Sequence, residues 1–129
     1  MNILDIPNLQ EAICSENIFY IHFTLGKPME KIKPDEFVAQ LKASRFVILD
    51  FSSPGCAPCK KVPPLLAELM TEMSDTSIRA FEVDVTENIE FAQKFMVLGV
   101  PTIIIFKEGK EVIRFNSVPK KDKIKKALS

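Results

Sequence analysis

The chain has 129 residues, 47% of them hydrophobic and 26% charged, and its 17 Lys and Arg residues balance its 17 Asp and Glu residues. This length and composition are typical of one globular domain with a substantial core. The balanced charge excludes a strong overall attraction to nucleic acid or to an anionic membrane surface. No apolar stretch reaches the length of a membrane span, so we expect neither nucleic acid nor a membrane among the partners.

The start of the chain lacks the features of a secretory signal. The segment MNILDIPNLQEAIC has no basic region and contains Asp5 and Pro7. We therefore expect a cytoplasmic, reducing location, although a mature chain that had lost a leader would look the same. In a reducing compartment two close cysteines are more often catalytic or metal-binding than structural.

The first 28 residues are expected to form a short N-terminal extension to a domain that spans residues 29–129. A possible helix over 8–16 precedes a strand over 18–23, IFYIHF, which is aromatic and β-branched. This strand could pair with a sheet edge, cover an apolar patch or form a dimer contact. The pattern does not choose among these, so the oligomeric state stays open.

The next two segments predict a helix followed by a buried strand. PDEFVAQLKA places Pro34 at a helix start, with two acids in the first turn. RFVILDF, over 45–51, is a continuous apolar run interrupted by one acid, which is typical of a strand buried on both faces. From residue 56 a long helix is expected, because apolar side chains recur at spacings of three and four: Val62, Leu65, Leu66, Leu69, Met70 and Met73.

The second half of the domain predicts a strand, a helix, a hairpin and a last helix. IRAFEVDV, over 78–85, reads as a strand, and Thr86 is a candidate cap for a helix that runs to about Met96. PTIIIFKEGKEVIRF predicts a hairpin whose turn contains Gly109, and a final helix starts near Pro119. The order β-α-β-α-β-α-β-β-α predicts an α/β domain with a central mixed sheet and helices on both faces.

Two of the three cysteines lie where the buried strand passes into the long helix. If Cys56 is near the first helical position, its sulfur faces free backbone N–H groups and the positive end of the helix dipole. Both favour a thiolate, and Lys60 and Lys61 add to the effect. Cys56 is therefore the candidate nucleophile. Cys59, one turn further on and more shielded, is the candidate resolving thiol.

The residues around the cysteines are expected to tune their redox potential. Ala57 and Pro58 separate the pair, and Pro58 restrains the loop, while Lys60 follows it. An alternative is a zinc site completed by Cys14 and His22, but the tight second ligand pair is missing, so we predict no metal. An inert disulfide is equally disfavoured in a reducing compartment. Cys14 is expected to be a small buried hydrophobe, with a regulatory role as the alternative, and His22 a structural histidine.

Three separated segments together resemble the thioredoxin family. They are VILDFSSPGCAPCKKVPPLLAEL, FEVDV and GVPTIIIFKEGKEV, and their order and distances match that family from about Met29 to the end. The resemblance implies the thioredoxin fold and dithiol–disulfide exchange. It also implies that Cys56 is the attacking cysteine and Cys59 the resolving one.

The resemblance assigns roles to residues outside the cysteine motif. Asp50 matches the family's buried acid, which takes the proton from the second cysteine. An acid inside an apolar strand should also have a raised pKa, because burial disfavours its charged form. Pro64 matches a proline that kinks the long helix. Pro101 matches a cis-proline that packs beside the disulfide.

Substrate contacts are expected from two loops. The backbone that flanks Pro101, at Val100 and Thr102, is expected to bind the substrate chain, and Gly55 directly precedes the first cysteine. Many thioredoxins have tryptophans at the positions of Gly55 and Ser52, and this chain has none. The flat apolar surface that meets a substrate is therefore reduced.

Three further positions depart from the family pattern: Ala57 and Ser117 stand where a glycine is common, and Glu82 where some members carry a lysine near the buried acid. These changes leave the expected reaction type intact. They bear on substrate range, on redox potential and on recognition by a standard thioredoxin reductase.

The sequence thus predicts a cytoplasmic protein-disulfide reductase without a bound cofactor. Its partners would be disulfide-containing proteins and a thioredoxin-reductase-type protein, or small thiols, that returns it to the dithiol state. Two alternatives remain. One is a disulfide oxidant or isomerase, and the other is a dedicated partner-binding module with incidental redox activity.

Overall fold

The computed structural model describes residues 29–74 and 77–129. The expected helix over 8–16 and strand over 18–23, with Cys14 and His22, lie outside these residues. The described elements, in chain order, are β1 (Glu30–Lys31), α2 (Pro34–Ala43), β2 (Phe46–Ser52), the 3-10 helix η1 (Pro58–Lys61), α3 (Val62–Met73), β3 (Ile78–Asp84), α4 (Ile89–Lys94), β4 (Thr102–Lys107), β5 (Lys110–Phe115) and α5 (Lys121–Ala127).

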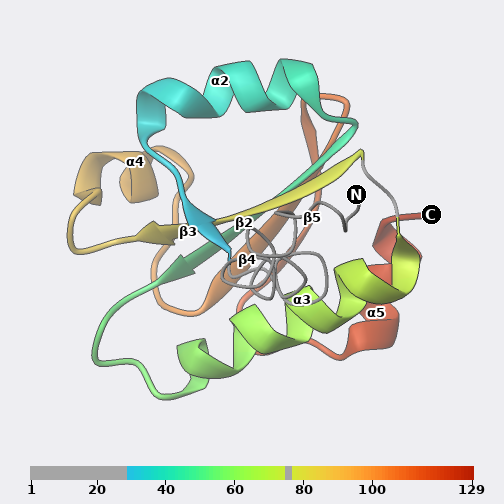
Figure 1. Ribbon diagram of the computed structural model, residues 1–129. Helices are drawn as coiled ribbons and strands as arrows, with labels where there is room; N and C mark the ends of the chain where they lie inside the picture. The colour runs from blue at the N-terminus through green and yellow to red at the C-terminus, as the bar shows by residue number, and fades with distance from the viewer. Residues whose placement is uncertain (1–28, 75–76) are drawn as a thin grey trace, which may run out of the picture.

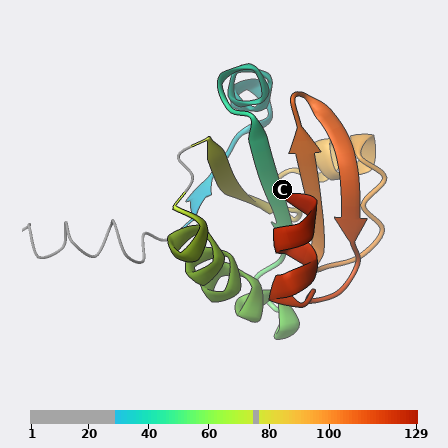
Figure 2. The ribbon, with the colours of Figure 1, turned by 90° about the vertical axis from the view of Figure 1, so that its right-hand side faces the viewer.

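The strands form one mixed sheet in the order β1-β3-β2-β4-β5. β3 runs parallel to β1 and β2, whereas β4 runs antiparallel to β2 and β5. Figures 1 and 2 show α2 and α4 on one side of the sheet and α3 and α5 on the other. The predicted α/β architecture, with helices on both faces of a mixed sheet, is confirmed.

Strand β2 lies in the middle of the sheet, and every one of its residues is buried. Successive side chains of a strand point to opposite faces. Val47, Leu49 and Phe51 pack into a cluster with α2 and α4, while Phe46 and Ile48 pack with α3 and α5. The continuous apolar run in the sequence reflects this burial on both faces.

The long helix expected from residue 56 is divided in two. A 3-10 turn, η1, comes first, and the α-helix α3 begins only at Val62. Pro63 and Pro64 then occupy the first turn of α3, where backbone N–H groups have no acceptor within the helix, so proline is tolerated. Pro64 therefore stands at the start of the α-helix and does not kink its interior.

The prediction that Thr86 caps the following helix is wrong. Helix α4 has Asn88 as its N-cap and ends at Lys94, before Met96. The backbone N–H and the hydroxyl of Thr86 donate instead to Asp84 Oδ1, at 2.8 and 2.6 Å. The short-range bond to Asp84 stabilises a turn after β3, and the helix begins beyond it.

The hairpin between β4 and β5 is confirmed. Its two-residue turn consists of Glu108 and Gly109, which have φ angles of 51° and 85°. A turn with two positive φ angles matches the twist of the flanking strands and favours glycine. Among residues 29–74 and 77–129, no helix is long and apolar enough to cross a membrane.

Candidate active site

The cysteine pair lies at one end of the sheet. Strand β2 ends at Ser52, and the chain turns through residues 53–57 into η1. Because β4 runs antiparallel to β2 and Thr102 pairs with Phe51, the loop that precedes β4 lies at this same end. Figure 1 shows the two loops together, at the tip of β2 and the start of β4.

Cys56 and Cys59 are joined in a disulfide, with their Cα atoms 5.3 Å apart. The backbone N–H of Cys59 donates a hydrogen bond to the sulfur of Cys56, at 3.1 Å. Cys59 is only 3% exposed, whereas Cys56 is partly exposed. A partner can therefore approach the sulfur of Cys56 more readily than that of Cys59.

The electrostatic setting of Cys56 differs from the expected one. Cys56 precedes η1 by two residues and does not occupy a first helical position. The N–H of Cys59, and not the end of a long helix, is the donor found at its sulfur. A donor in this position stabilises negative charge on the sulfur once the pair is reduced. Lys60 and Lys61 have exposed side chains, and Ala57 and Pro58 are exposed as well.

Asp50 lies at the centre of the sheet on the face covered by α3. It is 0% exposed, and neither oxygen of its carboxyl group has a hydrogen-bond partner. Burial, and then the negative charge of Glu82, raise the pKa of Asp50 from 3.8 to about 7. The expected buried acid is therefore present, and its carboxyl group can gain or lose a proton near neutral pH.

A hollow leads from the surface to the buried cysteine. Cys59, Ser52 and Glu82 form part of its wall, and the rest comes from Lys31, Ser53, Pro54, Lys60, Pro63 and Asp84. The hydroxyl of Ser52 donates to Glu82 Oε2 at 3.0 Å. The resemblance marked Ser52 and Glu82 as departures from the family pattern and placed Glu82 near the buried acid, but it did not place Ser52 beside Glu82. Their contact was missed, because 30 residues separate them along the chain.

The loop before β4 contains a cis peptide bond between Val100 and Pro101, as the resemblance implied. Pro101 is buried and Val100 is partly exposed. Thr102 is buried, and its hydroxyl donates to the carbonyl oxygen of Gly99 at 2.7 Å. The side chain of Thr102 therefore holds the loop in place and is not free to meet a substrate.

Two exposed apolar residues in this loop were not singled out from the sequence. Leu98 is 97% exposed and Met96 is 73% exposed. Met96 also has a positive φ angle of 56°, which is uncommon for a residue other than glycine. The position of Leu98 directly before the GVP segment is the one signal that could have drawn attention to it.

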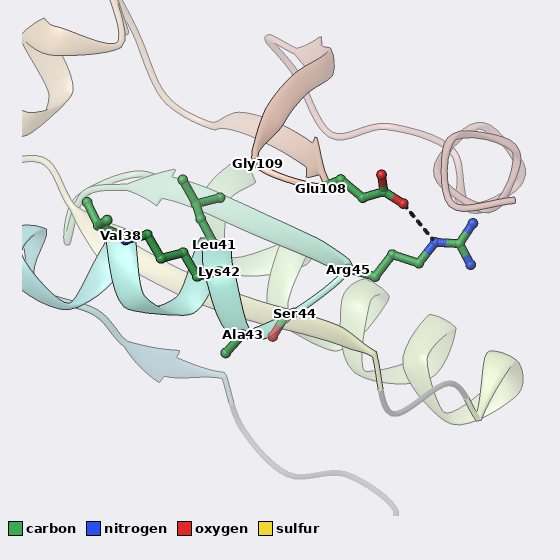
Figure 3. A pocket seen from close by; sticks show the side chains of 8 residues that line it. All are labelled: Val38, Leu41, Lys42, Ala43, Ser44, Arg45, Glu108 and Gly109. Carbon is green, nitrogen blue, oxygen red and sulfur yellow. Dashed lines mark ion pairs between the residues drawn. The ribbon is translucent and has the colours of Figure 1, made fainter.

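A second hollow lies at the opposite end of β2 and contains no cysteine (Figure 3). Arg45 and Glu108 point toward one another across it, and their side chains form an ion pair at 3.8 Å. The remaining wall consists of Val38, Leu41, Lys42, Ala43, Ser44 and Gly109. Because no cysteine lines this hollow, the candidate site for thiol chemistry is at the opposite end, where Cys56 and Cys59 lie.

A cysteine pair that can open and close, with one exposed and one buried sulfur and a buried acid on the same sheet face, defines a thiol–disulfide oxidoreductase. The thioredoxin family model matches residues 28–129, and the chain belongs to the thioredoxin family.

Curated relatives and solved structures agree with this assignment. The chain is 35% identical to thioredoxin of Chlamydia trachomatis serovar D over 101 residues, which cover 78% of this chain and 97% of that protein. It is 37% identical to thioredoxin of Mycobacterium tuberculosis over 89 residues, which cover 69% and 76%. A mutant thioredoxin from Halobacterium salinarum superposes with a TM-score of 0.69 at 26% identity, over 78% of this chain and 87% of that one.

Proposed function

We propose that this protein reduces disulfide bonds in other proteins, with Cys56 as nucleophile, Cys59 as resolving thiol and Asp50 as proton acceptor. The observation that carries the assignment is the difference in access between the two sulfurs, with Cys59 buried and Cys56 partly exposed. The sulfur of Cys56 must reach a substrate disulfide. The sulfur of Cys59 has to reach only the sulfur of Cys56.

The reaction follows from these positions. The Cys56 thiolate attacks a substrate disulfide, forms a mixed disulfide and releases one substrate sulfur as a thiolate, which takes a proton from water. Cys59 then transfers its proton to the carboxylate of Asp50 and attacks the sulfur of Cys56. The Cys56–substrate S–S bond breaks, the second substrate sulfur leaves as a thiolate that takes a proton from water, and the Cys56–Cys59 disulfide described above forms.

Neighbouring residues adjust and position this chemistry. Ala57, Pro58 and Lys60 surround the pair on the exposed side and are the residues proposed to set its redox potential. The backbone at Val100 and Pro101 is proposed to bind the substrate chain, in a loop held by the side chain of Thr102.

Gly55 completes the substrate surface. A Cβ atom built at Gly55 would meet nothing within 4 Å, so this position faces open space. The backbone of Gly55 is therefore free to lie against a substrate.

The electrons are proposed to come from a thioredoxin-reductase-type protein or from small thiols, and no bound cofactor is required. A cytoplasmic location is proposed as well, because a reducing compartment keeps the pair in the dithiol state. Residues 1–28 are proposed to be an extension to the redox domain at 29–129.

Serine substitutions of the two cysteines test the mechanism. We expect Cys56→Ser to abolish reduction of a disulfide-containing protein and to form no covalent complex. Cys59→Ser should also lose turnover, but should accumulate a mixed disulfide visible by non-reducing electrophoresis, because nothing resolves it. If both variants keep wild-type function, the redox mechanism is wrong and the domain is a binding module.

The midpoint potential of the pair decides between reductase and oxidant. Equilibration with defined thiol–disulfide buffers measures it, and about 30 mV corresponds to about 1.4 kcal/mol for this two-electron couple. A strongly reducing value supports the proposed direction. A value near those of oxidising enzymes contradicts it and favours an oxidant or isomerase.

A further inference from the structure

One row of side chains crosses the sheet from its edge to its centre. The parallel registers pair Lys31 with Glu82 and Glu82 with Asp50, and the antiparallel register pairs Asp50 with Ile103. Side chains opposite one another on neighbouring strands point to the same face. Exposure rises outward along this row, from the fully buried Asp50 through the partly exposed Glu82 to the exposed Lys31.

The side chain of Glu82 is held beside the cysteine pair. Ser52 is two residues after Asp50 on β2, so both side chains point to the same face, and the Ser52 hydroxyl donates to Glu82 Oε2 at 3.0 Å. Glu82, Ser52 and Cys59 line one hollow that opens to the surface. The carboxylate of Glu82 thus lies between the buried acid and solvent.

Among the described groups on this face of the sheet, Glu82 is the charged residue that lies directly beside Asp50 in the register. Asp84 lies two residues further along β3, and its carboxylate accepts two hydrogen bonds from Thr86. The groups packed over this face from the other elements are apolar or lie at its rim. They are Ile103 from β4, Cys59 and the exposed Lys60 from η1, Val62, Pro63 and Leu66 from α3, Ile124 from α5, Leu128 directly after α5, and the exposed Lys31 from β1.

We propose that Glu82 is a positioning residue for the exchange reaction: its carboxylate, held by Ser52 on the same sheet face as Asp50, acts through its charge on the transfer of a proton from Cys59 to Asp50. This inference rests on the proposed role of Asp50 as proton acceptor for Cys59. When Cys59 attacks the mixed disulfide, its proton passes to Asp50, and Asp50 later releases the proton to solvent. No electrons pass through Glu82, which acts by charge alone.

Electrostatics support this geometry. Burial is the largest cause of the raised pKa of Asp50, and the negative charge of Glu82 is the second. A negative neighbour disfavours a second carboxylate, because like charges repel. Removal of that charge should therefore lower the pKa of Asp50 while burial continues to keep it above the ordinary value.

Glu82→Gln tests the proposal, with Asp84→Asn as its matched control. Each substitution removes one negative charge from β3 at the same hollow. The glutamine oxygen can still accept from Ser52, and the asparagine oxygen from Thr86, so both variants should fold. The Asp50 carboxyl is titrated by carbon NMR in the oxidised protein, and the release of a small thiol from its mixed disulfide with Cys56 is timed against pH.

We expect Glu82→Gln to move both midpoints to lower pH. Resolution should then be faster than wild type below the wild-type midpoint, where more Asp50 is ionised, and slower above it, because Asp50 has become a weaker base. Asp84→Asn should leave both curves in place. If Glu82→Gln leaves the Asp50 titration unchanged, or if Asp84→Asn shifts it equally, the proposal is wrong.

Asp50→Asn separates this inference from the proposed function. If Asp50→Asn resolves the mixed disulfide at the wild-type rate at every pH, the role assigned to Asp50 fails, and the role of Glu82 fails with it. If Asp50→Asn is slow but Glu82→Gln leaves the pH midpoint unchanged, only the role of Glu82 fails. The Asp50→Asn/Glu82→Gln double variant should have the same pH profile as Asp50→Asn alone, because Glu82 has no Asp50 left to act on.

Discussion

The two faces of the sheet are built from different side chains. On the α2 and α4 face, phenylalanine rings pack against one another with centroids 5.1–6.2 Å apart: Phe37, Phe51, Phe91, Phe95 and Phe106. On the α3 and α5 face the buried core is mostly aliphatic, with Leu66, Leu69, Ile103, Ile105 and Ile124. Asp50 lies on this second face.

The contrast explains how a buried acid is accommodated. Most of these ring pairs are edge-to-face and the two that involve Phe51 are tilted; edge-to-face pairs add attraction beyond the burial of their apolar area. The aromatic face therefore holds β2 in place through Phe51 and its neighbours. The aliphatic face offers the carboxyl group of Asp50 no hydrogen-bond donor, so burial raises its pKa. The ring contacts on the aromatic face therefore stabilise the fold. On the aliphatic face the burial of Asp50 lowers stability, but the raised pKa suits this group to proton transfer.

The largest loss of stability is expected from Phe37→Ala on the aromatic face. Phe37 is buried and its ring meets those of Phe91, Phe95 and Phe106 at 5.3–5.5 Å. Truncation of a buried phenylalanine costs about 3–5 kcal/mol, because it leaves a cavity. Denaturant unfolding of the oxidised protein measures this loss, and the Asp50 titration should not move in the variant. A loss below about 1 kcal/mol would show that the ring cluster does not carry the stability of this face.

On the aliphatic face, Asp50→Asn should increase stability in a pH-dependent way. In the wild type the pKa of folded Asp50 is above its ordinary value. Below pH 3.8 the buried carboxyl group is protonated and does not lower the free energy of unfolding, and stability is lost as pH rises toward about 7. The gain of the variant should therefore be larger at pH 8 than at pH 4. The shift corresponds to about 4 kcal/mol, which is an upper bound on the gain of the variant. Unfolding at pH 4 and at pH 8 measures the difference. A gain independent of pH would contradict the assignment.

The smallest effect is expected from Glu72→Gln, an exposed carboxylate on α3. Glu72 pairs with Lys121 and with Lys125, the latter at 2.6 Å, and hydrogen bonds from these lysines lower its pKa. Its stabilisation is therefore present above the ordinary pKa and is lost as pH falls, which is the opposite sign to Asp50. The effect should be slight and should vanish in high salt. A salt-independent effect as large as that of Asp50→Asn would remove the distinction between buried and exposed charge.

Sequence patterns predicted the local structure correctly where a single physical preference, such as burial on both faces or a turn with positive φ angles, decides the conformation. The apolar run at 45–51 predicts the buried strand, because burial on both faces leaves no place for alternation. The hairpin at Gly109 follows from two β-branched runs and a turn that needs positive φ angles. The family resemblance added the cis bond at Pro101, which the residues alone did not imply.

Predictions failed where two local preferences compete. Thr86 has the chemistry of a helix cap, but the carboxylate of Asp84 accepts from it two residues away. The apolar periodicity at residues 62–73 suggested one helix from the cysteines onward. Pro63 and Pro64 place the α-helix start later, because proline fits only where an N–H is not needed.

The sequence by itself determined the order of elements, the dithiol chemistry of Cys56 and Cys59, and the presence of an acid in a buried strand. Strand alternation also determines that Asp50 and Phe51 lie on opposite faces. The family resemblance implied that Glu82 lies near Asp50. Only the tertiary structure decided that Asp50 faces the aliphatic side, that Glu82 is its partner in the parallel register, and that Ser52 holds Glu82. The physical reason is that strand register joins residues about 30 positions apart, and it is set by the packing of the whole sheet between its helices.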